Sequence, residues 1–69
     1  MSKTQKELEF AAMALLATAR EVGEGPASAY YLAMQERGFS YEEFLFVVGI
    51  LEAGGFITHR VHVIKAVKP

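Results

Sequence analysis

The sequence predicts a mostly α-helical domain in which three helices are followed by a C-terminal strand or short hairpin. Two Ser/Thr-x-x-Glu pairs, at Thr4 and Ser40, each precede a long apolar run, as is typical of helix N-termini. The only segment that alternates and is rich in β-branched residues is FITHRVHVIKAV, at residues 56–67. The length of 69 residues fits a single domain spanning residues 1–69.

The first helix is expected to run from a capping box at Thr4 and Glu7 to Val22, with Gly23 as its left-handed stop. Its apolar residues form two stripes at helical spacing. The stripe expected to face the core contains Leu8, Ala12, Leu15, Ala19 and Val22. The neighbouring stripe contains Phe10, Met13 and Ala17.

The second helix is expected from Pro26 to about Arg37, because proline is tolerated in the first turn of a helix. The residues expected to point inward are Ala27, Tyr30, Tyr31 and Met34. A third helix follows from Ser40, whose capping partner is Glu43, and ends at the two glycines 54 and 55. Its expected core stripe is Phe44, Leu45, Val48 and Leu51, with Phe46, Val47 and Ile50 covering much of its remaining surface.

The C-terminal segment contains no Gly, Pro, Asn or Asp within residues 56–67. A two-residue hairpin turn usually requires one of these residues. Two alternatives therefore remain open from the sequence: a short hairpin turning near residues 59–61, or one long unpaired strand.

A tight RGFS turn between the second and third helices, followed by LEAGGFI opening into a basic strand, resembles the winged helix-turn-helix family. The matching positions of its helix-to-wing pattern are Leu51, Glu52, Gly55, Phe56 and Ile57. The resemblance covers about residues 24–68 and implies a winged-helix-like domain. Many functions use this fold, so the resemblance implies architecture more directly than activity.

The third helix departs from the DNA-reading members of that family. Base recognition in the major groove relies on Arg, Lys, Asn or Gln, and none of these occurs between Ser40 and Gly55. Residues 1–56 carry a net charge of −4, whereas residues 57–69 carry +3. A DNA-binding regulator would therefore contact phosphates mainly through its basic C-terminal strand. The candidate phosphate contacts are Arg37, His59, Arg60, His62, Lys65 and Lys68.

Protein binding or self-association is the favoured interpretation, because the apolar helix surface exceeds what one small core is expected to cover. The candidate interface residues are Phe10, Met13, Ala17, Phe46, Val47 and Ile50. We therefore expect a homodimer, or docking on another protein. The alternative is that all these side chains fit into one core. A further hypothesis places a peptide groove at an aromatic cluster of Tyr30, Tyr31, Phe39, Tyr41, Phe44 and Phe46.

No catalytic, cofactor-binding or metal-binding residue is predicted, and we expect a non-enzyme. Adjacent Glu42 and Glu43 diverge by about 100° on a helix, and His59 and His62 are not spaced to share a metal on one strand. The segment FAAMALLATAR loosely resembles a signal peptide, but glutamates precede it. No run approaches the ~20 apolar residues of a membrane span. The cysteine-free composition is compatible with the expected cytoplasmic location.

Overall fold

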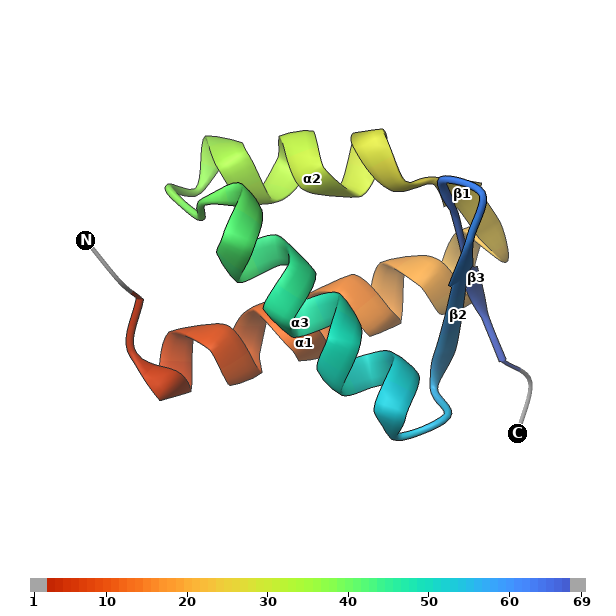
Figure 1. Cartoon of the computed structure of the whole chain (residues 1–69), viewed down its shortest axis with the longest axis horizontal. Helices are drawn as coiled ribbons and strands as arrows, with labels where there is room; N and C mark the ends of the chain where they lie inside the picture. Colours follow the sequence, from red (N-terminus) through yellow and green to blue (C-terminus); the bar gives the residue numbers. More distant parts are fainter. Residues whose placement is uncertain (1–2, 68–69) are drawn as a thin grey trace.

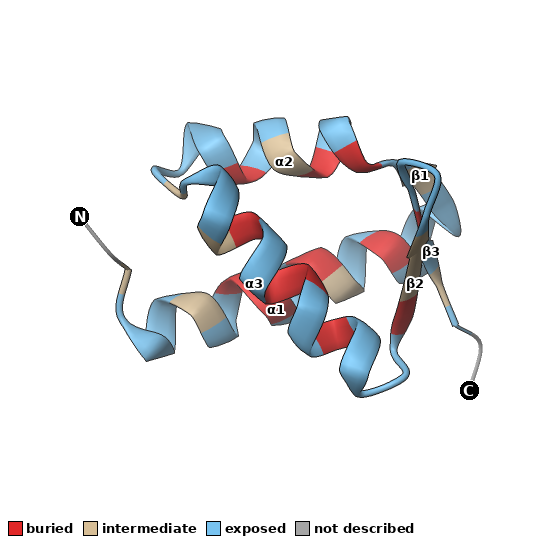
Figure 2. Ribbon diagram, in the orientation of Figure 1, coloured by how far each residue is buried: buried red, intermediate tan, exposed pale blue. Residues whose placement is uncertain are grey.

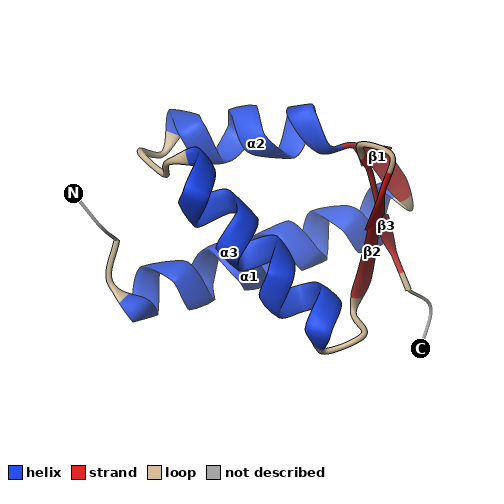
Figure 3. Cartoon of the chain, in the orientation of Figure 1, coloured by secondary structure: helices blue, strands red, loops and turns tan. Residues whose placement is uncertain are grey.

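The computed structural model describes residues 3–67 and contains three helices and three short strands. The elements follow the order α1 (Gln5–Val22), β1 (Glu24–Pro26), α2 (Ala27–Glu36), α3 (Tyr41–Ala53), β2 (Ile57–Arg60) and β3 (Val63–Ala66). The strands form one antiparallel sheet in the order β1-β3-β2, which lies at one end of the helices (Figures 1 and 3). The predicted fold class, three helices with a small C-terminal β element, is confirmed.

Both predicted capping boxes are present and set the beginnings of α1 and α3. The Thr4 side chain accepts from the backbone N–H of Glu7, and the Glu7 carboxylate accepts from the N–H of Thr4. Ser40 and Glu43 repeat this reciprocal arrangement. Gly23 ends α1 with a φ of 87°, a backbone conformation that favours glycine.

Strand β1 was not predicted, because the sequence suggested only a break before the second helix. Pro26 is the last residue of β1 and the N-cap of α2, so α2 begins one residue later than expected. The strand pairs with β3, with Gly25 opposite Ile64. A proline is tolerated there because β1 is an edge strand of the sheet.

The C-terminal segment forms a short hairpin, so the alternative of one long unpaired strand is wrong. Strands β2 and β3 pair from Ile57 opposite Ala66 to Arg60 opposite Val63. The two turn residues, Val61 and His62, both have positive φ values, of 50° and 64°. Positive φ at both positions is the geometry of a type I′ turn, which usually contains Asn-Gly or a similar pair.

The core lies between the three helices and the inner face of the sheet (Figure 2). Two sequence assignments on α3 are corrected: Val47 is fully buried, whereas Leu45 is 41% exposed. The physical reason is the helical period, because Val47 shares a face with Phe44 and Leu51 at three- and four-residue spacing. Val22 is also exposed, since it is the last residue of α1 and lies beyond the core.

Candidate functional site

An apolar groove of about 440 Å³ lies between α1 and α2. Phe10 and Ala14 of α1 line one wall, and Ala29 and Ala33 of α2 line the other. Arg37, which caps the C-terminus of α2, lies at one end. Small-molecule and peptide pockets typically occupy about 300–1,000 Å³ and are mostly apolar. The groove therefore has the size and lining of a binding surface.

Tyr30 lines the same groove, and only 8% of its surface is exposed to solvent. Its hydroxyl is buried and has no hydrogen-bond partner within residues 3–67. Burial raises the pKa of the Tyr30 hydroxyl, because the phenolate would lose its hydration. The ring packs close to β1, where a Cβ at Gly25 would lie 3.4 Å from Cε2 of Tyr30. The sequence predicted Tyr30 in a groove of aromatic residues and not in this one, because this groove forms only when α1, β1 and α2 lie beside one another.

The candidate interface residues on α1 are exposed. Phe10 is 67% exposed and Met13 is 71% exposed, and Ala17 is also exposed on the same helix. Met13 and Ala17 lie on the side of α1 opposite its buried residues, Ala11, Ala12, Leu15 and Ala19. Phe10 lies at the edge of that side, where it also lines the groove. The predicted second stripe is therefore an outward surface of the folded chain.

On α3, two of the three candidate interface residues are exposed. Phe46 is 56% exposed and Ile50 is 47% exposed, and they are four residues apart on one face of the helix. Val47 belongs to the core and cannot contribute to an interface, so this assignment is wrong. The charged residues among the exposed positions of α3 are Glu42 and Glu52, which leaves this face apolar and acidic.

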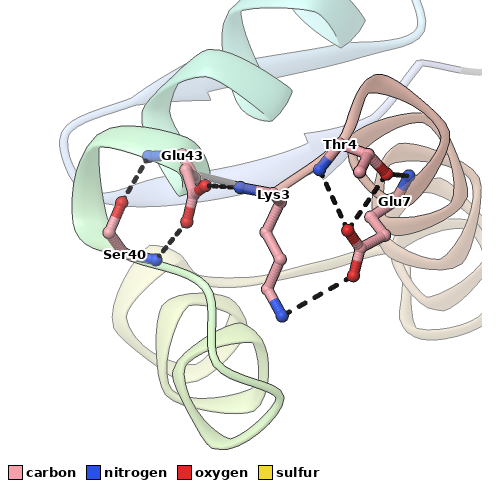
Figure 4. Close-up of polar contacts among 5 residues, drawn as sticks. All are labelled: Lys3, Thr4, Glu7, Ser40 and Glu43. Carbon is pink, nitrogen blue, oxygen red and sulfur yellow. Dashed lines mark hydrogen bonds and ion pairs between the residues drawn. The ribbon is translucent and has the colours of Figure 1, made fainter. Parts of the chain in front are cut away.

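The α1 and α3 N-termini are joined by polar contacts around Lys3 (Figure 4). The backbone N–H of Lys3 donates to Oε2 of Glu43 at 2.6 Å, and its Nζ lies 3.8 Å from Oε2 of Glu7. The Lys3 ammonium also lies 5.0 Å from the centroid of the Phe39 ring, within the range of a cation–π interaction. These contacts hold the beginning of α1 against the turn that precedes α3.

The carboxylates in these contacts have lowered pKa values. For Glu43, the backbone N–H of Ser40 is the main cause, and the N–H of Lys3 adds to it. For Glu7, the pKa is lowered chiefly by the backbone N–H of Thr4. Hydrogen bonds to the ionised form stabilise that form, which is why both pKa values fall. The local arrangement therefore accounts for these shifts as parts of helix caps.

The predicted aromatic cluster divides into separate groups. Tyr31 lies 5.2 Å from Tyr41 and 5.5 Å from Phe44 between ring centroids, so these three rings form one group. Tyr30 instead lines the groove between α1 and α2, and Phe46 is exposed on α3. The peptide groove hypothesised at this aromatic cluster is therefore not formed as one surface. Two of its members, Tyr30 and Phe39, instead line the groove between α1 and α2.

The candidate phosphate contacts also lie in different places. Arg60 and Lys65 are exposed and point to the same side of the sheet, because each sits on the face opposite the buried Ile57 and Ile64. His59 is half-buried and shares the inner face with Ile64. His62 is exposed in the turn.

The remaining two predicted contacts do not join that group. Arg37 lies at the end of α2 away from the sheet (Figure 1). Lys68 lies outside the described residues. Within residues 3–67, the cations brought together on the outer face of the sheet are thus Arg60 and Lys65.

Comparison with known proteins finds no family model, no curated protein and no solved structure that matches the chain. Among the helices of residues 3–67, none combines the length and the apolar character needed to cross a membrane.

Proposed function

We propose that this chain is a small, non-catalytic binding module of winged-helix type that associates with a second copy of itself or with another protein. The observation that supports the proposal is the exposure of large apolar side chains on two outer helix faces. Phe10 and Met13 on α1, and Phe46 and Ile50 on α3, are each between 47% and 71% exposed. Large exposed apolar patches commonly mark protein-interaction surfaces.

The helix order and the hairpin after α3 support the winged-helix assignment. Along the chain, the β2–β3 hairpin comes directly after α3, which is the position of a wing after a third helix. The acidic and apolar surface of α3 favours protein binding over base reading, because no Arg, Lys, Asn or Gln lies on that helix. The proposal includes a cytoplasmic location, in keeping with the cysteine-free sequence.

The test is the mass of the purified chain in solution. We expect light scattering coupled to size-exclusion chromatography to give a mass above the 7.6 kDa of one chain at concentrations of tens of micromolar. A mass of one chain throughout, together with no capture of a partner protein at these concentrations, would contradict the proposal.

A second candidate function is DNA binding through the hairpin. The observation that favours it is the outward placement of Arg60 and Lys65 on the sheet, next to an exposed turn at Val61 and His62. Binding that rests on a few cation–phosphate contacts falls steeply as salt is raised. Gel shifts with random duplex DNA at low salt would test it, and no shift at tens of micromolar protein would exclude it.

A further inference from the structure

The outward side of α1 carries a narrow stripe of five exposed residues. Lys6, Phe10, Met13, Ala17 and Glu21 follow one another at spacings of four, three, four and four residues. At 3.6 residues per turn, these spacings keep all five within one band along the helix. We call this set the α1 stripe. It begins with a cation, ends with an anion and is apolar between them.

The α1 stripe of one copy is complementary to the α1 stripe of a second copy that runs in the opposite direction. If two copies of α1 pack antiparallel about a two-fold axis next to Met13, Lys6 of one copy lies opposite Glu21 of the second copy. The same arrangement places Phe10, the largest side chain of the stripe, opposite Ala17, the smallest. Symmetry repeats each of these contacts, as in any two-fold interface. A parallel pair would instead place each lysine against a lysine and each glutamate against a glutamate.

We propose that the α1 stripe is a homodimer interface, in which the α1 helices of two copies pack antiparallel around a two-fold axis at Met13. This inference rests on the proposed protein-binding function and commits it to one partner, a second copy of the chain. Phe10 of each copy packs on Ala17 of the other, and the Lys6–Glu21 pairs close both ends of the interface.

The two charged ends of the α1 stripe are available for these contacts. The ion pair found within residues 3–67 joins Lys3 to Glu7, so it occupies neither Lys6 nor Glu21. Glu9, the acid three residues after Lys6 on the helix, accepts a hydrogen bond from the side-chain amide of Gln5 instead. The intermolecular pairs therefore do not compete with an ion pair inside the chain.

The size of the interface predicts modest affinity. The α1 stripe spans 15 residue steps, or about 22 Å of helix. A standard interface buries about 800 Å² per partner, which is about one sixth of the 4970 Å² surface of this chain. One helix pair covers less than that, and interfaces at the small end are weak. We therefore expect a dissociation constant in the micromolar range.

The exposed face of α3 is a less suitable surface for a second copy. Phe46 and Ile50 would supply apolar contacts there, but the exposed charged residues of that helix are Glu42 and Glu52. A two-fold axis on this face would bring glutamates together with no cation of α3 to offset them. Like charges placed together across an interface are unfavourable. This face is better suited to a partner with basic side chains.

Charge reversal at the two ends of the α1 stripe tests the pairing. Lys6→Glu and Glu21→Lys should each raise the dissociation constant about tenfold, since each creates two like-charge contacts worth roughly 0.2–1 kcal/mol apiece. Mixing the two variants should restore association, because every cross-copy contact is then between opposite charges. Both substitutions place charge favourably along the helix dipole, so circular dichroism should show that each variant remains folded.

Cysteine cross-linking tests the geometry independently, since the chain has no native thiol. Met13→Cys should give a disulfide-linked dimer under mild oxidation, because facing Cα atoms near the axis lie within disulfide reach. Leu32→Cys, 57% exposed on α2, is the matched control and should stay largely uncross-linked.

The outcomes separate this inference from the proposed function. A dimer by light scattering in which Met13→Cys cross-links no better than Leu32→Cys, or in which the mixed charge variants stay apart, overturns the α1 pairing but leaves protein binding intact. A single-chain mass for the wild-type protein up to about 100 µM overturns the homodimer itself. Selective cross-linking at position 13 together with rescue on mixing supports the inference.

Discussion

The turn of the β2–β3 hairpin provides a direct test of the backbone geometry. Val61 and His62 both adopt the left-handed conformation, with φ values of 50° and 64°. That conformation costs L-residues roughly 1–2 kcal/mol each and is least suited to β-branched side chains such as valine. The double substitution Val61→Asn and His62→Gly introduces the pair that type I′ turns favour.

The expected gain follows from the surroundings of the turn. Val61 is 89% exposed, so replacing its side chain removes almost no packing. The contact that the turn makes with α2 runs from the N–H of Ala27 to the carbonyl of His62 and survives the change of side chain. Relief of strain is partly offset by the greater freedom of glycine in the unfolded chain. We expect a net stabilisation of about 1 kcal/mol, which raises Tm by roughly 4–8 °C in a domain of this size.

The assay is thermal unfolding followed by circular dichroism at a fixed protein concentration. Val61→Ala is the control, because it removes the branching but keeps a Cβ in the left-handed region, so it should raise Tm by less than the Asn-Gly variant does. Val61→Pro should lower Tm, since proline fixes φ near −65°. An unchanged or lower Tm for the Asn-Gly variant would refute the type I′ assignment.

Three further predictions concern the core and the caps. Val47→Ala should destabilise the fold by about 2 kcal/mol in urea unfolding, because Val47 is fully buried. Leu45→Ala, at an exposed position, should lower the free energy of unfolding clearly less. Equal losses for the two variants would contradict the corrected orientation of α3. Tyr30→Phe should leave stability unchanged or raise it by about 1 kcal/mol, since it deletes a buried hydroxyl without a partner, and a marked loss would reveal a hydrogen bond at that hydroxyl. The pKa of Glu43 lies below its ordinary value of 4.5, so its stabilising contribution is complete above that pH and is lost as pH falls through the lower folded-state pKa. Urea unfolding between pH 7 and pH 3 should therefore show a smaller acid-induced loss for Glu43→Gln than for the wild-type chain, and parallel curves would argue against the cap contacts of Ser40 and Glu43.

Local chemistry in the sequence was enough to predict the three helices and where α1 and α3 begin. A capping box acts within four residues, so Thr4 with Glu7 and Ser40 with Glu43 determine where α1 and α3 begin whatever surrounds them. The alternation of β-branched residues likewise predicted a β element after α3. The outward stripe of α1 was also visible in the sequence, because its residues recur at helical spacing.

Only the tertiary structure decided the features that depend on distant segments. Glu24 joins a strand because Lys65, far along the chain, lies beside it in β3, and no local pattern in three residues encodes that pairing. On an apolar helix such as α3, the packing of neighbouring elements determines that Val47 is buried and Leu45 is exposed. The groove with the Tyr30 hydroxyl exists only once α1 and α2 are held apart by the sheet and α3. Short-range hydrogen bonds can thus be predicted from neighbouring residues in the sequence, whereas burial and strand pairing depend on the assembled fold.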